Sequence, residues 1–144
     1  MTIKKNKIVI FTDLDGSILH RDTFKFDQIK DYIKKLINSG IHIIPNSSKT
    51  ESEIIEFNQD LGENLAYISE NGSVINGLNL LNSNFPNKII LSREKEELVE
   101  IFKNNVPENL QSKCKFVSNL NKKDQINIFG LSDAKLKNAL NRKY

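Results

Sequence analysis

Hydrophobic and polar residues follow two periods along the first part of the chain. Residues 7–12 form a β-branched and aromatic run that stops at a turn-forming Asp-Leu-Asp-Gly segment, which is typical of a strand buried on both faces. Apolar residues then recur every three or four positions between residues 29 and 37, and Ser39-Gly40 closes this amphipathic helix. Residues 41–44 repeat the strand pattern and stop at Pro45, so the pattern predicts a βαβ unit.

The same alternation continues through a second helix and a third strand. The second helix begins near Thr50 or Glu51 and ends at Gly62, and residues 65–68 form the strand. Two Asn-Gly dipeptides then bracket residues 73–75, which predicts a small hairpin attached to that strand. Strands that alternate with helices favour an open, doubly wound α/β sheet with right-handed crossovers.

The pattern changes near residues 83–87, where we place a boundary between a βα core and a smaller α+β segment. Ser92 is expected to cap a helix whose apolar side includes Phe102. Residues 115–117 are expected to form a strand, and Ser132 to cap a last helix that ends near residue 140. The predicted domains are therefore residues 1–84 and residues 85–144.

Composition narrows the class of protein. The chain has 144 residues, of which 38% are hydrophobic, and this length allows one domain with a small appendage. Its 21 Lys and Arg are interleaved with 18 Asp and Glu, which disfavours a nucleic-acid partner. No apolar stretch approaches the roughly 20 residues that cross a bilayer and the start lacks a secretory pattern, so we expect a cytoplasmic protein without a membrane partner. The single cysteine, Cys114, excludes an internal disulfide framework and is expected to be a small packing residue.

Two carboxylates follow the first strand directly. Ligands of open α/β sheets bind beyond the carboxyl ends of the strands, and Asp13 and Asp15 lie at such an end with one residue between them. A like-charge pair at this place favours a hard divalent cation with oxygen ligands, above all Mg²⁺. Gly16 lets the backbone turn tightly and brings main-chain N–H groups towards an anion.

The second strand is followed by residues suited to phosphate. Ser47 and Ser48 supply hydroxyl groups, Lys49 supplies a compact positive charge, and a helix N-terminus follows. Together the two strand ends predict phosphoryl transfer through an aspartyl-phosphate. The alternative interpretations are that the serines cap the helix, that the lysine is an ordinary solvated residue, and that the two aspartates only form a turn.

The first of these segments resembles a known motif. Phe11-Thr12-Asp13-Leu14-Asp15-Gly16-Ser17 is similar to the first motif of the haloacid dehalogenase superfamily of Mg²⁺-dependent phosphatases. Pro45-Asn46-Ser47-Ser48-Lys49-Thr50-Glu51, Glu70-Asn71-Gly72 and the last residues, 129–144, resemble the mannosyl-3-phosphoglycerate phosphatase family within it. From the residues alone, however, Glu70-Asn71-Gly72 is expected to be a turn.

This resemblance implies a fold and a set of roles. The fold would be a Rossmann-like core with a partial parallel sheet in residues 1–84, followed by a partial α+β cap in residues 85–144. Asp13 would be the nucleophile and Asp15 the acid/base, and both would contact Mg²⁺, Asp15 through its main-chain carbonyl. Ser47 and Lys49 would bind the phosphoryl oxygens of a phosphosugar such as mannosyl- or glucosyl-3-phosphoglycerate.

The resemblance extends only to the amino-terminal portion of such enzymes. The superfamily's third motif contributes a lysine and its fourth an acidic pair, and neither lies within these 144 residues. We therefore expect this polypeptide alone to hydrolyse phosphate esters poorly or not at all. We also expect self-association through an uncovered edge of the first strand, or poor solubility. Two other classes stay open, a non-catalytic Mg²⁺- and phosphate-binding remnant and a phosphoacceptor signalling module. The second of these is disfavoured, because no aspartate follows the third strand.

Overall fold

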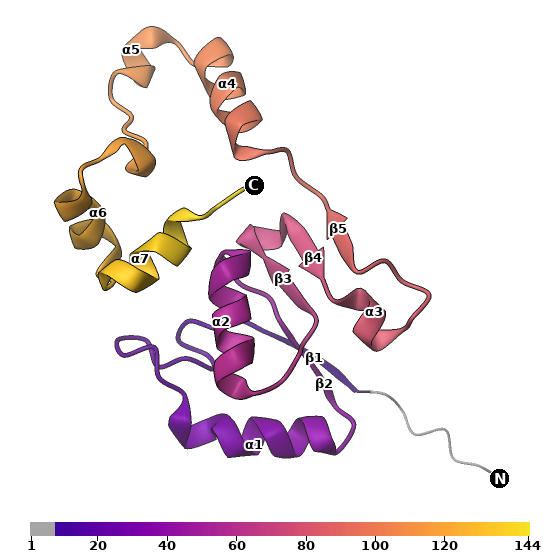
Figure 1. The fold of residues 1–144 in the computed structure, drawn as a ribbon. Helices are drawn as coiled ribbons and strands as arrows, with labels where there is room; N and C mark the ends of the chain where they lie inside the picture. The colour runs from indigo at the N-terminus through magenta and orange to yellow at the C-terminus, as the bar shows by residue number, and fades with distance from the viewer. Residues whose placement is uncertain (1–7) are drawn as a thin grey trace.

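The computed structural model describes residues 8–144, and its strands and helices alternate through the first half of the chain (Figure 1). Residues 1–7, including the first residue of the predicted opening strand, lie outside that range. The elements up to residue 81 are β1 (Val9–Thr12), α1 (Asp27–Asn38), β2 (His42–Pro45), α2 (Glu51–Leu61), β3 (Tyr67–Ser69), the 3₁₀ turn η1 (Glu70–Gly72), β4 (Val74–Asn76) and α3 (Leu78–Leu81). The later elements are β5 (Lys88–Ile90), α4 (Lys95–Asn105), α5 (Glu108–Gln111), the 3₁₀ turn η2 (Val117–Asn119), α6 (Lys122–Phe129) and α7 (Asp133–Leu140).

The strands form the α/β arrangement that the sequence pattern predicts. β1 pairs parallel with β2, with Thr12 opposite Pro45. The Ser47 main-chain N–H donates to the Ile68 carbonyl at 3.1 Å, which joins the end of β2 to β3 in the parallel sense. β3 and β4 form the predicted hairpin, and β5 continues it antiparallel. The parallel sheet and its hairpin are thus confirmed.

Local sequence explains where the two core helices begin and end. Thr50 caps α2, because its hydroxyl accepts from the Glu53 N–H while the Glu53 carboxylate accepts from the Thr50 N–H. Gly62 ends α2 in the left-handed conformation, with φ of 75°. α1 ends at the predicted Ser39-Gly40. The two predicted helices are confirmed.

The core lies between these helices and β2. Its buried apolar side chains come from the β1–α1 loop, α1, β2, α2 and β3. They are Leu14, Leu19, Ile33, Ile43, Ile54, Phe57, Leu61, Leu65 and Tyr67.

β1 itself is exposed, and the expectation of a strand buried on both faces is wrong. Phe11 is 61% exposed and Val9 is 44% exposed. The cause is tertiary: among residues 8–144, β2 is the one strand that pairs with β1. The β-branched run therefore forms a strand without its predicted burial.

The second half of the chain differs from the prediction at several places. α4 begins at Lys95 rather than after Ser92, because the Lys95 N–H donates to the Lys143 carbonyl at 2.7 Å and thereby ties the helix start to the end of the chain. The predicted strand over residues 115–117 is irregular backbone leading into η2, where the Phe116 ring packs edge-on against Phe102. Cys114 is exposed and does not pack in the core.

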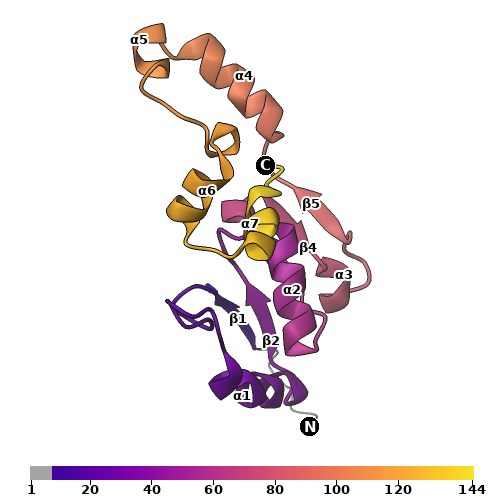
Figure 2. The same ribbon diagram turned by 60° about the vertical axis from the view of Figure 1, so that its left-hand side comes forward.

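The last segment returns to the core. α7 follows Ser132 as predicted, although the serine hydroxyl makes no capping bond, and it packs against α2, as Figure 2 shows. α4 and α5 lie at the end of the molecule away from α1 in both views. Because β5 pairs with β4 across the predicted boundary, residues 1–84 and 85–144 share a sheet, and their division into two domains stays a proposal. Within the described residues, no helix combines the length and the apolar character needed to cross a bilayer.

Candidate active site

The two polar segments singled out from the sequence leave the sheet at one edge. The Asn46 N–H donates to the Thr12 carbonyl at 2.8 Å, which extends the parallel pairing by one residue beyond the strands. Asp13 and Asn46 therefore emerge side by side, as the carboxyl ends of parallel strands must. The predicted meeting of the two strand ends is confirmed.

Asp13 opens a tight turn that the buried Leu14 anchors. One carboxylate oxygen of Asp13 accepts from the Leu14 N–H at 2.7 Å, and the Leu14 carbonyl accepts from the Leu19 N–H at 2.7 Å. Gly16 has a φ of 74°, so it makes the predicted turn. Its N–H, however, donates to the Leu19 carbonyl at 2.9 Å, so that particular group does not point towards an anion.

Asp15 and Lys49 bring the two strand ends into direct contact. The Lys49 ammonium lies 3.0 Å from the Asp15 carboxylate and 3.8 Å from that of Glu53. The Lys49 side chain is only 14% exposed, whereas that of Asp15 is 39% exposed. Lys49 also lies 5.1 Å from the centre of the Phe24 ring. The lysine is therefore held in place at the site, and the interpretation of an ordinary solvated residue is wrong.

The two serines have different surroundings. Ser47 is buried, and its hydroxyl oxygen accepts from the Lys49 N–H at 3.3 Å. Ser48 is exposed, and its carbonyl accepts from the Arg142 guanidinium at 2.6 Å. Neither serine caps α2, because Thr50 does so. The capping alternative is therefore wrong for both.

Asp15, Ser48 and Lys49 line a cavity with a volume of about 190 Å³, whereas Asp13, Gly16 and Ser47 are not among its lining residues. Several residues that were not predicted from the sequence also line it. They are Phe24 and Glu53 from the first half of the chain and Phe129, Leu131, Ala139 and Arg142 from the second. Phe24 has a φ of 55°, a left-handed conformation that bulky residues rarely adopt and that clusters at functional sites. Sequence spacing carries no signal for these contacts, because they join segments far apart in the chain.

Glu70-Asn71-Gly72 forms a turn, as the residues alone predict, and it holds the end of the chain. Glu70 and Asn71 both have left-handed φ values, 52° and 59°. The Glu70 carboxylate is 1% exposed and accepts from the main-chain N–H groups of Lys143 and Tyr144. Its position indicates a structural role beside the site.

The oxygen atoms at the strand ends supply only some of the ligands that a hard cation needs. Asp13 is exposed and one of its carboxylate oxygens accepts from the Leu14 N–H, and the Asp15 carbonyl follows two residues later. Over residues 8–144, no three acidic, histidine or cysteine side chains gather in one place. Mg²⁺ commonly keeps several waters and takes one or two carboxylates plus substrate phosphate, which this pair of donors can accommodate.

Comparison with known proteins identifies the family to which the chain belongs. Residues 10–138 match the haloacid dehalogenase-like hydrolase family over most of the chain, so the chain belongs to that family. Two solved structures share the fold. A haloacid dehalogenase-like hydrolase from Bacteroides thetaiotaomicron has a TM-score of 0.53 at 17% identity, over 68% of this chain and 36% of that one. A hypothetical protein from Geobacillus kaustophilus HTA426 has a TM-score of 0.52 at 17% identity, over 72% and 37%.

Curated relatives carry a more particular name. A glucosyl-3-phosphoglycerate/mannosyl-3-phosphoglycerate phosphatase from Persephonella marina is 32% identical over 68 residues, which are 47% of this chain and 25% of the relative. One of the same name from Methanococcoides burtonii is 36% identical over 69 residues, 48% of this chain and 25% of the relative. Each match thus spans a quarter of the relative's length.

Proposed function

We propose that this chain carries the nucleophile-bearing part of a Mg²⁺-dependent phosphatase that acts on glucosyl- or mannosyl-3-phosphoglycerate. The observation that carries the proposal is the ion pair between Asp15 and Lys49, at 3.0 Å, across the ends of two parallel strands. This ion pair supports the proposal because it joins an acidic turn to a cation. The names of the relatives supply the substrate.

Asp13 is the proposed nucleophile. Its exposed carboxylate attacks phosphorus, the bond from phosphorus to the glycerate oxygen breaks, and an aspartyl-phosphate forms. Asp15 donates a proton to the leaving oxygen and then removes one from the water that hydrolyses the intermediate. Hydrolysis returns inorganic phosphate and a free Asp13 carboxylate.

Lys49 and Ser47 hold the phosphoryl group in this proposal. The substrate phosphate competes with Asp15 for the Lys49 ammonium, so binding frees the Asp15 carboxyl group to face the leaving oxygen. The hydroxyl of the buried Ser47 donates to a phosphoryl oxygen. Gly16 allows the turn that aims Asp15 into the site, and Ser48 lines the cavity beside Lys49.

The Asp13 carboxylate and the Asp15 carbonyl would hold Mg²⁺. Bound there, the ion would offset negative charge on the phosphoryl oxygens. The described residues offer few further ligands, since no group of three Asp, Glu, His or Cys side chains among them could hold a metal ion. We therefore propose that these 144 residues alone catalyse slowly. The same observation favours a second candidate function, the binding of Mg²⁺ and phosphate without turnover.

Phosphate release from glucosyl-3-phosphoglycerate, with and without Mg²⁺, tests the proposal. Asp31 is an exposed carboxylate on α1, so Asp31→Asn is the matched control for Asp13→Asn. We expect slow, Mg²⁺-dependent release from the wild type and the control, and none from Asp13→Asn. Release by Asp13→Asn at the wild-type rate would contradict the role of Asp13. A wild-type kcat in the usual enzymatic range, above about 1 s⁻¹, would contradict slow catalysis. Faster phosphate release from a different phosphosugar would contradict the proposed substrate.

A further inference from the structure

The cavity at the candidate site has two walls of different chemistry. The core wall carries Asp15, Phe24, Ser48, Lys49 and Glu53, so both of its carboxylates lie on the side of Lys49, with which they pair. The opposite wall comes from α6, α7 and the residues after α7, and it is apolar apart from its last member, Arg142. A ligand that reaches Lys49 therefore meets a second cation at the rim of the same cavity.

The charge of Arg142 is not neutralised by a carboxylate in the part of the chain that the structure describes. Lys49, in contrast, is paired with Asp15 and Glu53. The Arg142 guanidinium donates one hydrogen bond, to the Ser48 carbonyl at 2.6 Å, and a guanidinium has five N–H donors in a fixed fork. Its remaining donors are available, and their geometry suits a carboxylate or a phosphate.

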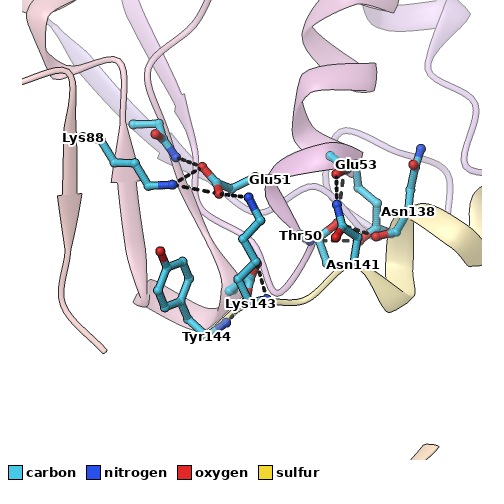
Figure 3. Close-up of polar contacts among 11 residues, drawn as sticks. Thr50, Glu51, Glu53, Lys88, Asn138, Asn141, Lys143 and Tyr144 are labelled. Carbon is cyan, nitrogen blue, oxygen red and sulfur yellow. Dashed lines mark hydrogen bonds and ion pairs between the residues drawn. The ribbon is translucent and has the colours of Figure 1, made fainter. Parts of the chain in front are cut away.

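The chain on both sides of Arg142 is anchored. Before it, the Asn141 side-chain amide donates to the Ser52 hydroxyl at 2.8 Å. After it, the N–H groups of Lys143 and Tyr144 donate to the buried Glu70 carboxylate at 3.1 and 2.8 Å. Figure 3 shows Asn141 beside the N-terminal end of α2 and Lys143 reaching towards Glu51 at the start of that helix. The guanidinium is thus held in position before any ligand binds, which lowers the entropy cost of using it.

We propose that Arg142 binds the carboxylate of the phosphoglycerate portion of the substrate and so selects phosphate esters that carry a second anionic group. This inference rests on the proposed function, in which Lys49 takes the phosphate. Two cations on the two walls of one small cavity match a ligand with two separated negative charges. The apolar residues beside Arg142 exclude water from the ion pair and thereby strengthen it.

A matched pair of ligands isolates the carboxylate. 3-Phosphoglycerate and glycerol 3-phosphate share a phosphate and three carbons, but only the first has a carboxylate. Their dissociation constants, measured by calorimetry with Mg²⁺ present, are compared for the wild type, Arg142→Gln and Lys137→Gln. Lys137 is an exposed cation on α7 without a described ion pair, so its variant is the control.

We expect the wild type and Lys137→Gln to bind 3-phosphoglycerate at least ~10-fold more tightly than glycerol 3-phosphate, as a charged hydrogen-bonded pair allows. Arg142→Gln should lose this preference while its affinity for glycerol 3-phosphate stays within about two-fold of wild type. An unchanged glycerol 3-phosphate affinity also shows that the variant is folded.

If the wild type binds the two ligands with equal affinity, the proposed role of Arg142 is wrong, but the proposed phosphate site is not contradicted. An equal loss of both affinities in Arg142→Gln would also overturn it, because a purely structural role predicts that result. If neither ligand binds the wild type, the phosphate site of the proposed function fails, and the inference fails with it.

Discussion

Thr50 is one of the residues that join the core to the returning end of the chain, because its hydroxyl group bonds both within α2 and to α7. The residue is fully buried. Its hydroxyl accepts from the Glu53 N–H at 3.3 Å, which caps α2, and donates to the Asn138 carbonyl of α7 at 2.9 Å. Figure 3 shows Thr50 between the two helices. Removing the hydroxyl therefore acts on both.

The magnitude follows from these contacts. Loss of the cap costs about 1 kcal/mol, and loss of the buried bond to Asn138 costs about 1 kcal/mol more. Removal of the buried γ-methyl group lowers the free energy of unfolding by about 0.8 kcal/mol more. Thr50→Ala should thus lower the free energy of unfolding by about 3 kcal/mol, and Thr50→Ser, which loses only the methyl group, by about 1 kcal/mol.

Urea unfolding of the two variants measures this difference, and hydrogen exchange of the α7 amides locates it. We expect α7 to exchange faster in Thr50→Ala than in Thr50→Ser, because only the first loses the contact with Asn138. Equal unfolding free energies for the two variants would refute the reasoning. So would wild-type protection of α7 in Thr50→Ala.

Three further predictions concern other parts of the chain. A Cβ on Gly77, whose φ is 75°, would lie 2.9 Å from the Ala66 Cα, whereas one on Gly130, at φ 64°, would meet open space. Gly77→Ala should therefore cost about 3 kcal/mol in urea unfolding and Gly130→Ala about 1 kcal/mol, and equal costs would contradict the close approach. Burial alone would raise the pKa of Glu51, but hydrogen bonds from Lys88 and Asn76 and the charges of Lys88 and Lys143 bring that pKa below its ordinary value of 4.5. The stability that wild type holds over Glu51→Gln should thus be complete above about pH 4.5 and disappear as the pH falls through the lowered pKa, and a pH-independent difference would contradict it. The exposed apolar residues of β1 are proposed to drive self-association, which Phe11→Lys should reduce in light scattering, and a monodisperse wild-type monomer at high concentration would count against this.

Local patterns predict the elements of the first half because they encode local interactions. The three- and four-residue spacing from Ile29 to Ile37 and the Thr50–Glu53 capping box each depend on neighbours within one turn of helix. The exposure of β1 does not follow from its β-branched run, because burial depends on what packs against the strand. The start of α4 at Lys95 likewise depends on Lys143, a distant residue.

The contacts of the candidate site also fall into those that the sequence predicts and those that it does not. The contact between Asp15 and Lys49 is predictable, since a general rule places the carboxyl ends of parallel strands at one edge. Arg142 reaches Ser48 from 94 positions away, and Phe24 enters the cavity through a left-handed backbone that no short motif signals. These contacts arise from the return of α7 to α2, which depends on the tertiary structure.

Calorimetric titration with beryllofluoride in the presence of Mg²⁺ tests the central claim most directly, because this anion mimics a phosphoryl group on an aspartate and requires no turnover. The wild type and Asp31→Asn should both bind it, with Asp13 as acceptor and Lys49 as counter-charge, and Asp13→Asn should show no heat of binding. Binding by Asp13→Asn with wild-type affinity, or no binding by the wild type, would contradict the placing of a phosphoryl acceptor at the end of β1.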